Sequence, residues 1–201
     1  MRKWIERFLA AIVLAVISPL LLIIAASIAS TMGWPVLFTQ ERAGRGGTAF
    51  KLIKFRTMHE SLSLNGELLP DSDRLTAFGR WLRNTSLDEL PELLNIARGE
   101  MAFVGPRPLP IAYVERYSES ERLRLDVLPG LTGWAQVKGR NAVEWDTRLA
   151  LDVWYVAHRS LYLDLKILLA TIRVVLSGGG INAKDSATMN ELRPPNDGGL
   201  K

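Results

Sequence analysis

Two adjacent carboxylates, Asp88 and Glu89, are the side chains in this sequence best suited to chemistry. Arg83 comes shortly before them, and Arg107 follows in a Gly-Pro-Arg-Pro turn. Since an α-helix accepts proline only in its first turn, Pro91 predicts that a helix begins near Asp88. Carboxylates beside fixed cations at a helix N-terminus suit chemistry on a phosphate ester, with a divalent metal ion between the charges.

A structural role would explain the same acidic residues. Ser86 and Glu89 have the spacing of a capping box, and acidic side chains stabilise the first turn of any helix. Spacing alone favours this role. The cations Lys54, Arg83 and Arg107 favour a functional role, in which an ionised carboxylate is a nucleophile or a metal ligand. Both interpretations stay open at this point.

The other basic candidates also have two interpretations each. Lys54 and Arg56 point to one face of a β-like run, which is either a solvated face or a phosphate contact. Arg107 is either an exposed turn residue or a ligand contact, and Gly105 beside it would let a ligand approach the backbone closely. Arg140 has the same ambiguity as Arg107.

The N-terminal part of the chain carries no charge from residue 8 to residue 40. Residues 8–29 would form a helix of roughly 33 Å, about one hydrocarbon thickness. Pro19 in its middle removes a backbone donor, and the hydroxyl of Ser18 can bond to a freed carbonyl. These features favour a kinked spanning helix over a re-entrant helix-break-helix, although basic residues on both flanks suit two ends on the cytoplasmic side.

The rest of the chain predicts a mainly helical α+β domain. Two short β-like runs, Val36–Gln40 and Phe50–Phe55, predict a hairpin. The helix expected over Leu161–Leu176 has little polar surface, so it is either buried or at the lipid interface. After Ser177, a Gly-, Asn- and Pro-rich composition predicts a mobile tail. Further helices are expected over Thr76–Arg83, Ile111–Leu125 and Glu144–Val156, and a loop over residues 60–74.

Composition excludes several classes of site. The chain has no cysteine, which rules out disulfides, thiolate nucleophiles and cysteine-ligated zinc. His59 and His158 are its only histidines and suit surface or packing roles. No Walker loop, H-E-x-x-H or G-x-S-x-G motif occurs. The formal net charge of +4 is compatible with nucleic acid, anionic lipid or anionic small molecules as partners.

Several blocks of sequence occur in an order typical of one known family. They are Ser18-Pro19, F-T-Q-E-R-A-G, K-F-R-T-M, L-D-E-L-P-E-L-L-N, F-V-G-P-R-P-L, P-G-L-T-G-W-A-Q-V-K-G-R-N and L-D-L-K-I-L. On these blocks the chain resembles the small monotopic phosphoglycosyl transferases, the bacterial sugar transferase family that starts lipid-linked glycan assembly. The resemblance runs from the apolar N-terminus to about Leu176.

The resemblance implies a chemistry for the carboxylates. A UDP-sugar would bind with Mg²⁺, and Asp88 would attack the sugar-bearing phosphorus and release UMP. Polyprenol phosphate would then attack the phosphosugar-aspartyl intermediate. Glu89 would assist as metal partner or proton acceptor, so that Asp88 and Glu89 are also the expected metal ligands. The phosphates would be held by basic residues in the matching motifs, namely Lys54, Arg83, Arg107 and Arg140.

The resemblance also implies a membrane arrangement. Residues 1–34 would be a re-entrant anchor broken at Ser18-Pro19, which reverses the preference for a span. Residues 35–176 would be a catalytic domain with interfacial helices on the cytoplasmic side of the bacterial inner membrane, followed by the tail over 177–201. Expected partners are membrane lipid and downstream glycosyltransferases, and no nucleic acid is expected.

Two alternatives remain. In the first, Asp88 and Glu89 only bind metal, and polyprenol phosphate attacks the UDP-sugar directly in a ternary complex. In the second, the chain is not an enzyme but a membrane-anchored basic module that binds anionic lipid or nucleic acid through Lys51, Lys54 and Arg56.

Overall fold

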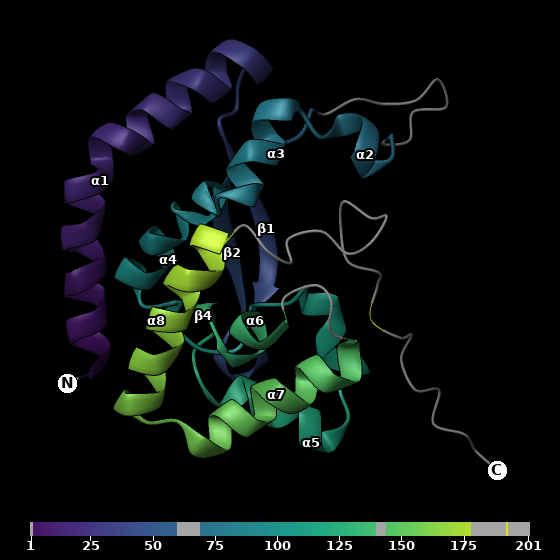
Figure 1. The fold of residues 1–201 in the computed structure, drawn as a ribbon. Helices are drawn as coiled ribbons and strands as arrows, with labels where there is room; N and C mark the ends of the chain where they lie inside the picture. Colours follow the sequence, from purple (N-terminus) through teal and green to yellow (C-terminus); the bar gives the residue numbers. More distant parts are fainter. Residues whose placement is uncertain (1, 60–68, 140–143, 178–191, 193–201) are drawn as a thin grey trace.

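The N-terminal apolar segment forms one long helix, α1 (Arg2–Met32), in a computed structural model that describes residues 2–59, 69–139, 144–177 and 192. Figure 1 shows α1 along the left edge of the molecule, bent near its middle. Pro19 lies inside the helix, and the Ser18 hydroxyl donates to the Ala15 carbonyl at 2.8 Å. Pro19 has no backbone N–H and so cannot donate to that carbonyl, four residues earlier in the helix. The predicted role of Ser18 is confirmed, but the segment is a continuous bent helix rather than helix-break-helix.

Both halves of α1 pack on the rest of the chain. In the first half, Ala10 is buried against Leu93 and Ile96 of α4 (Glu92–Arg98). In the second half, Ile24 and Ile28 are buried in a separate cluster. The other buried members of that cluster are Met32, Phe55 and Leu82. The helix therefore follows the domain along most of its length.

Hydrogen bonds also hold the two ends of α1 against the domain. Near the start, Arg7 Nε donates to the Ala97 carbonyl at 3.0 Å. At the end, the Arg56 guanidinium donates to main-chain carbonyls of residues 32, 33 and 34. These carbonyls belong to the last turn of α1 and the residues after it, where a helix leaves acceptors unsatisfied.

The outer face of α1 is apolar and exposed. The helix is long and apolar enough to cross a membrane, and only 11% of its most apolar window is buried. Its large exposed apolar side chains are Trp4, Ile5, Phe8, Leu9, Ile12, Val16, Leu20, Leu22 and Ile23. Such a surface requires cover from lipid or from another protein.

The predicted hairpin is confirmed and is longer than expected. Strands β1 (Leu37–Ala43) and β2 (Ala49–Phe55) pair antiparallel, with Leu37 opposite Phe55. The solvated-face interpretation of Lys54 and Arg56 is wrong. The Lys54 side chain is only 17% exposed, and Arg56 is buried at the end of α1.

A second pair of strands carries the chain into the Gly-Pro-Arg-Pro turn. Strands β3 (Ala102–Val104) and β4 (Gly130–Thr132) pair in parallel. A Cβ added at Gly130 would overlap the main-chain nitrogen of Gly105, and one added at Gly105 would lie 2.5 Å from the Leu128 carbonyl oxygen. Gly105 therefore permits close packing of the protein's own backbone, not the ligand approach that the sequence suggested.

The remaining chain is mostly helical, as predicted. The prediction of a single helix over Ile111–Leu125 is wrong. Tyr117 is extended, and Ser118 starts a new helix with its own capping box to Glu121. Residues 60–68 of the expected loop and most of the expected tail lie outside the described residues. The remaining elements are α2 (Asp71–Arg74), α3 (Ala77–Asn84), the 3-10 helices η1 (Arg45–Gly47), η3 (Ile111–Arg116) and η4 (Leu123–Asp126), α5 (Glu119–Arg122), α6 (Trp134–Gly139), α7 (Trp145–His158) and α8 (Leu161–Ser177).

Helix α8 has one buried face and one exposed apolar face. Leu163 and Ile167 are buried against Tyr155 of α7, whose hydroxyl donates to Asp164 at 2.6 Å. Thr171 shares a hydrogen bond of 2.7 Å with Thr132 of β4. The opposite face exposes Leu161, Tyr162, Leu165, Leu168, Leu169 and Ile172. The helix is thus packed on one side and presents an apolar stripe to its surroundings on the other.

We predict that Gly130→Ala destabilises the fold because the added methyl group has no space between β3 and β4. The expected loss is roughly 1–3 kcal/mol in the free energy of unfolding, measured by denaturant titration in detergent. Gly46→Ala is the control, since its added Cβ meets nothing within 4 Å and carries only the cost of a positive φ. Equal stability of the two variants would contradict the prediction.

Candidate active site

Asp88 and Glu89 lie in a 3-10 turn, η2 (Leu87–Glu89), which joins α3 to α4. The predicted capping box is wrong. Ser86 has a left-handed backbone with φ of 58°, its side chain caps nothing, and its main-chain carbonyl accepts from Glu89 N at 3.3 Å. The α-helix begins at Glu92, after Pro91, rather than near Asp88. The two carboxylates are therefore not used to cap a helix.

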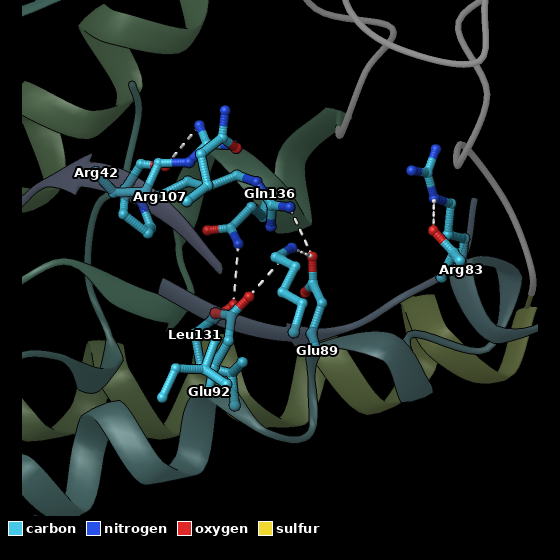
Figure 2. A network of polar contacts seen from close by, with 12 residues as sticks. Arg42, Arg83, Glu89, Glu92, Arg107, Leu131 and Gln136 are labelled. Atoms are coloured by element: carbon cyan, nitrogen blue, oxygen red, sulfur yellow. Dashed lines mark hydrogen bonds and ion pairs between the residues drawn. The ribbon is translucent and has the colours of Figure 1, made fainter. Parts of the chain in front are cut away.

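Glu89 is held between two cations. Its Oε1 lies 2.8 Å from Lys54 Nζ and 2.6 Å from Arg107 Nη2. Figure 2 shows both contacts meeting at this carboxylate. Burial would raise the pKa of Glu89, but the charges and hydrogen bonds of Arg107 and Lys54 outweigh it and hold the pKa well below its usual range. Glu89 is therefore ionised and a weak base.

Asp88 is in a different state. It is buried, with 8% of its surface exposed. Across the described residues no hydrogen bond or ion pair holds its carboxylate. Burial and the charge of Glu89 raise the pKa of Asp88 to about 6, against the lowering effect of Lys54, Arg83 and Arg107. The two adjacent carboxylates thus differ: Glu89 is an anion fixed by ion pairs, and Asp88 is free to contact a ligand.

Glu92 is a third acidic group at the site, and sequence reasoning missed it. It is 2% exposed, and its Oε1 lies 3.1 Å from Lys54 Nζ without accepting a hydrogen bond. Burial raises its pKa to about 7, against the opposing charge of Lys54. A glutamate after proline reads as an ordinary first-turn residue. Its spacing of three from Glu89 was the signal that could have identified it.

Arg83 borders the site from α3. Its Nε donates to Thr57 Oγ1 at 3.0 Å, and Figure 2 shows it at some distance from the Glu89 cluster. A Cβ at Gly79 would overlap the Thr57 carbonyl, so glycine allows α3 to approach this close. Burial lowers the pKa of Arg83, while Asp88 raises it. Arg140, the fourth predicted phosphate ligand, lies outside the described residues.

Arg107 is fixed by a buried ion pair that the sequence did not reveal. Arg124 Nη2 donates to the Arg107 carbonyl at 2.7 Å and also contacts Asp152 Oδ2 at 2.8 Å. Its Nη1 donates to the Tyr117 hydroxyl at 2.9 Å. The side chains of Arg124 and Asp152 are each 2% exposed. Helix α7 thereby holds the turn that presents Arg107 to Glu89.

A family model described as bacterial sugar transferase matches residues 1–178. The chain belongs to the bacterial sugar transferase family. This sugar transferase is 46% identical over 180 residues to the "Uncharacterized sugar transferase EpsL" of Bacillus subtilis (strain 168), covering 90% of this chain and 89% of that protein.

Two relatives have more specific names. The UDP-glucose:undecaprenyl-phosphate glucose-1-phosphate transferase of Caulobacter vibrioides is 42% identical to this sugar transferase over 178 residues, 84% of this chain and 67% of that protein. The undecaprenyl-phosphate galactose phosphotransferase of Salmonella typhimurium is 41% identical over 165 residues, 74% of this chain and 35% of that protein. The similarity thus covers most of this sugar transferase but only part of the longer relative.

The side chains fit a magnesium ion that arrives with a diphosphate substrate. In the part of the sugar transferase that the structure describes, no group of three or more His, Cys, Asp or Glu residues could hold a metal by itself. Mg²⁺ is usually bound by one or two carboxylates together with substrate phosphates and water. Asp88 can supply one carboxylate, and Glu89 retains a second oxygen because both its ion pairs use Oε1.

We predict that Asp152→Ala destabilises the sugar transferase by roughly 3–5 kcal/mol, because it leaves the Arg124 charge buried without its partner. Denaturant unfolding in detergent measures the loss. Asp126→Ala removes an exposed carboxylate close to Arg124 in sequence and should change stability by no more than about 0.5 kcal/mol. A loss below 1 kcal/mol for Asp152→Ala would show that the pair does not support the turn.

Proposed function

We propose that this protein transfers a sugar phosphate from a UDP-sugar to polyprenol phosphate through a covalent intermediate on Asp88, releasing UMP. The observation that carries the proposal is a buried, unpaired carboxylate beside a fixed anion–cation cluster. The relatives named as undecaprenyl-phosphate glucose-1-phosphate and galactose phosphotransferases support the substrate classes.

In the first step an Asp88 oxygen attacks the sugar-bearing phosphorus. The bond from this phosphorus to the bridging oxygen breaks, and UMP leaves with that oxygen. In the second step an oxygen of polyprenol phosphate attacks the same phosphorus, and the bond to Asp88 breaks. The product is a polyprenyl-diphospho-sugar, and the Asp88 carboxylate is restored. Dividing the transfer into two displacements means that neither substrate must wait for the other.

The cations make this approach of anions favourable. Arg107 and Lys54 offset the phosphate charge, and Arg83 borders the Asp88 side of the site. When bound by Asp88 and Glu89, Mg²⁺ would neutralise further charge on the diphosphate. Glu89 suits the role of metal partner and positioning group better than that of proton acceptor, since its pKa is lowered.

The alternatives differ in how well the structure supports them. Direct attack in a ternary complex would use the same residues and is separated by experiment below. The basic-module alternative requires Lys51, Lys54 and Arg56 at a surface. Lys51 is exposed, whereas Lys54 pairs with Glu89 and Arg56 caps α1. The internal use of Lys54 and Arg56 argues against binding to lipid or nucleic acid through this set of cations.

The membrane arrangement follows from the two apolar surfaces. We propose that α1 dips into one leaflet of the bacterial inner membrane and returns, with α8 at the interface and the site on the cytoplasmic side. Support comes from the exposed apolar faces of α1 and α8, together with the attachment of both ends of α1 to the same domain. A straight span would carry one end away from the domain.

We predict that the wild-type protein, given a UDP-sugar and Mg²⁺ without acceptor, releases about one UMP per active site and gains the mass of a phosphosugar. UDP-glucose and UDP-galactose are the first donors to try. Asp88→Asn should lower UMP release at least roughly a thousandfold, about 4 kcal/mol in barrier. Asp71→Asn in α2 is the matched control. Acceptor-dependent UMP release, with no adduct in the absence of acceptor, would instead establish the ternary mechanism.

We further predict that both flanks of α1 face the cytoplasm. Because the chain has no cysteine, Lys3→Cys and Trp34→Cys give single labelling sites. In inverted membrane vesicles both should react with an impermeant maleimide, and in spheroplasts neither should. Arg80→Cys, at an exposed position on α3, reports the side of the membrane on which the domain lies. Labelling of Lys3→Cys and Trp34→Cys from opposite sides would establish a span.

A further inference from the structure

Arg42 is a cation near the site that the proposed mechanism does not use. It lies near the end of β1, opposite Phe50, and forms an isolated bridge with Pro110. The next residue, Ala43, donates its main-chain N–H to the Leu109 carbonyl at 2.9 Å. The strand end is therefore fixed against the segment that follows Arg107.

The guanidinium of Arg42 is only partly satisfied by the protein. Nη2 donates to Gln40 Oε1 at 2.5 Å, and Nη1 reaches the Pro108 carbonyl at a long 3.5 Å. The buried Nε donates to no partner within the described residues. No described carboxylate forms an ion pair with Arg42, because the nearby Glu89 oxygen is taken by Lys54 and Arg107.

Two arginines here lie close enough to repel each other. Burial and the charge of Arg107 lower the pKa of Arg42 to about 10, although Glu92, Tyr113 and Glu89 act in the opposite direction. Holding like charges together in a poorly solvated place is costly unless an anion joins them. The missing partner is therefore negatively charged.

Figure 2 places Gln136 beside Arg42 and Arg107. Its Nε2 donates to the Leu131 carbonyl at 3.1 Å, while its buried Oε1 accepts no hydrogen bond within the described part of the chain. The unused acceptor Gln136 Oε1 and the unused donor Arg42 Nε thus occur in the same group of side chains. A ligand with phosphate oxygens and hydroxyl groups would satisfy both kinds of atom.

We propose that Arg42, together with Arg107, binds the phosphate that is not attached to Asp88, and so forms a phosphate-monoester subsite. This inference rests on the proposed function. The subsite would hold the phosphate of UMP in the first step and the phosphate of polyprenol phosphate in the second. Both are monoesters that must lie next to the same reacting phosphorus, so one subsite can serve each in turn.

A purely structural role for Arg42 explains less of the geometry. The Nη1 contact to Pro108 is at the limit of hydrogen-bond distance, and β1 is already joined to this segment by the main chain of Ala43. A residue that served only to join these segments would not need a buried, unused Nε.

Binding of UMP and of uridine to the Mg²⁺-loaded protein, measured by calorimetry, tests the proposal. Arg42→Gln should lower the affinity for UMP roughly tenfold or more and leave that for uridine unchanged, because only UMP carries the phosphate. Arg42→Lys should lose less, since it keeps the charge. Arg80→Gln makes the same charge change at an exposed position on α3 and should bind UMP as the wild type does.

A second measurement separates the two sources of phosphate. If Arg42→Gln keeps its preference for UMP over uridine but raises the KM for polyprenol phosphate about tenfold, the subsite serves the acceptor alone. If neither the affinity for UMP nor the KM for polyprenol phosphate changes, the proposal is overturned. It is also overturned if the affinity for uridine falls as much as that for UMP. The UMP and uridine binding measurements do not require transfer, so absence of a phosphosugar adduct in the wild type would count against the mechanism and not against the subsite.

Discussion

The negative charge on Glu89 is the constraint on which the site depends. The carboxylate is poorly solvated, so it stays ionised only because Arg107 and Lys54 converge on it. One oxygen atom thereby joins strand β2 to the turn after β3. With Glu89 occupied in this way, its neighbour Asp88 is left as the carboxylate available to a substrate.

The same elements serve the site and the apolar helix α1. Strand β2 carries Lys54 to Glu89, and two residues later Arg56 caps the end of α1. Helix α4 begins with Glu92 at the site, and its next turn packs on Ala10 of α1. The position of the carboxylates relative to the apolar face of α1 is therefore set by packing through two short elements. This arrangement suits the proposed transfer to an acceptor held in a membrane.

Local sequence patterns predicted most helices and the hairpin, because these elements depend on periodicity and nearby turns. The same reasoning failed where a pattern had two solutions. Ser86 and Glu89 have capping-box spacing, yet the left-handed backbone at Ser86 prevents that cap. One helix was predicted through Tyr117, whereas Ser118 and Glu121 start another helix there with a real capping box.

The sequence by itself determined the adjacent carboxylates, the apolar N-terminal helix and the bond from Ser18 to Ala15, all of which involve neighbours in the chain. Only the tertiary structure decided which cations meet Glu89, since Lys54 is 35 residues and Arg107 18 residues away from it. It also decided that Arg42 lies beside Arg107 and that Arg124 pairs with Asp152. Such pairings depend on how strands and helices pack, and the spacing of residues along the chain carries no record of that.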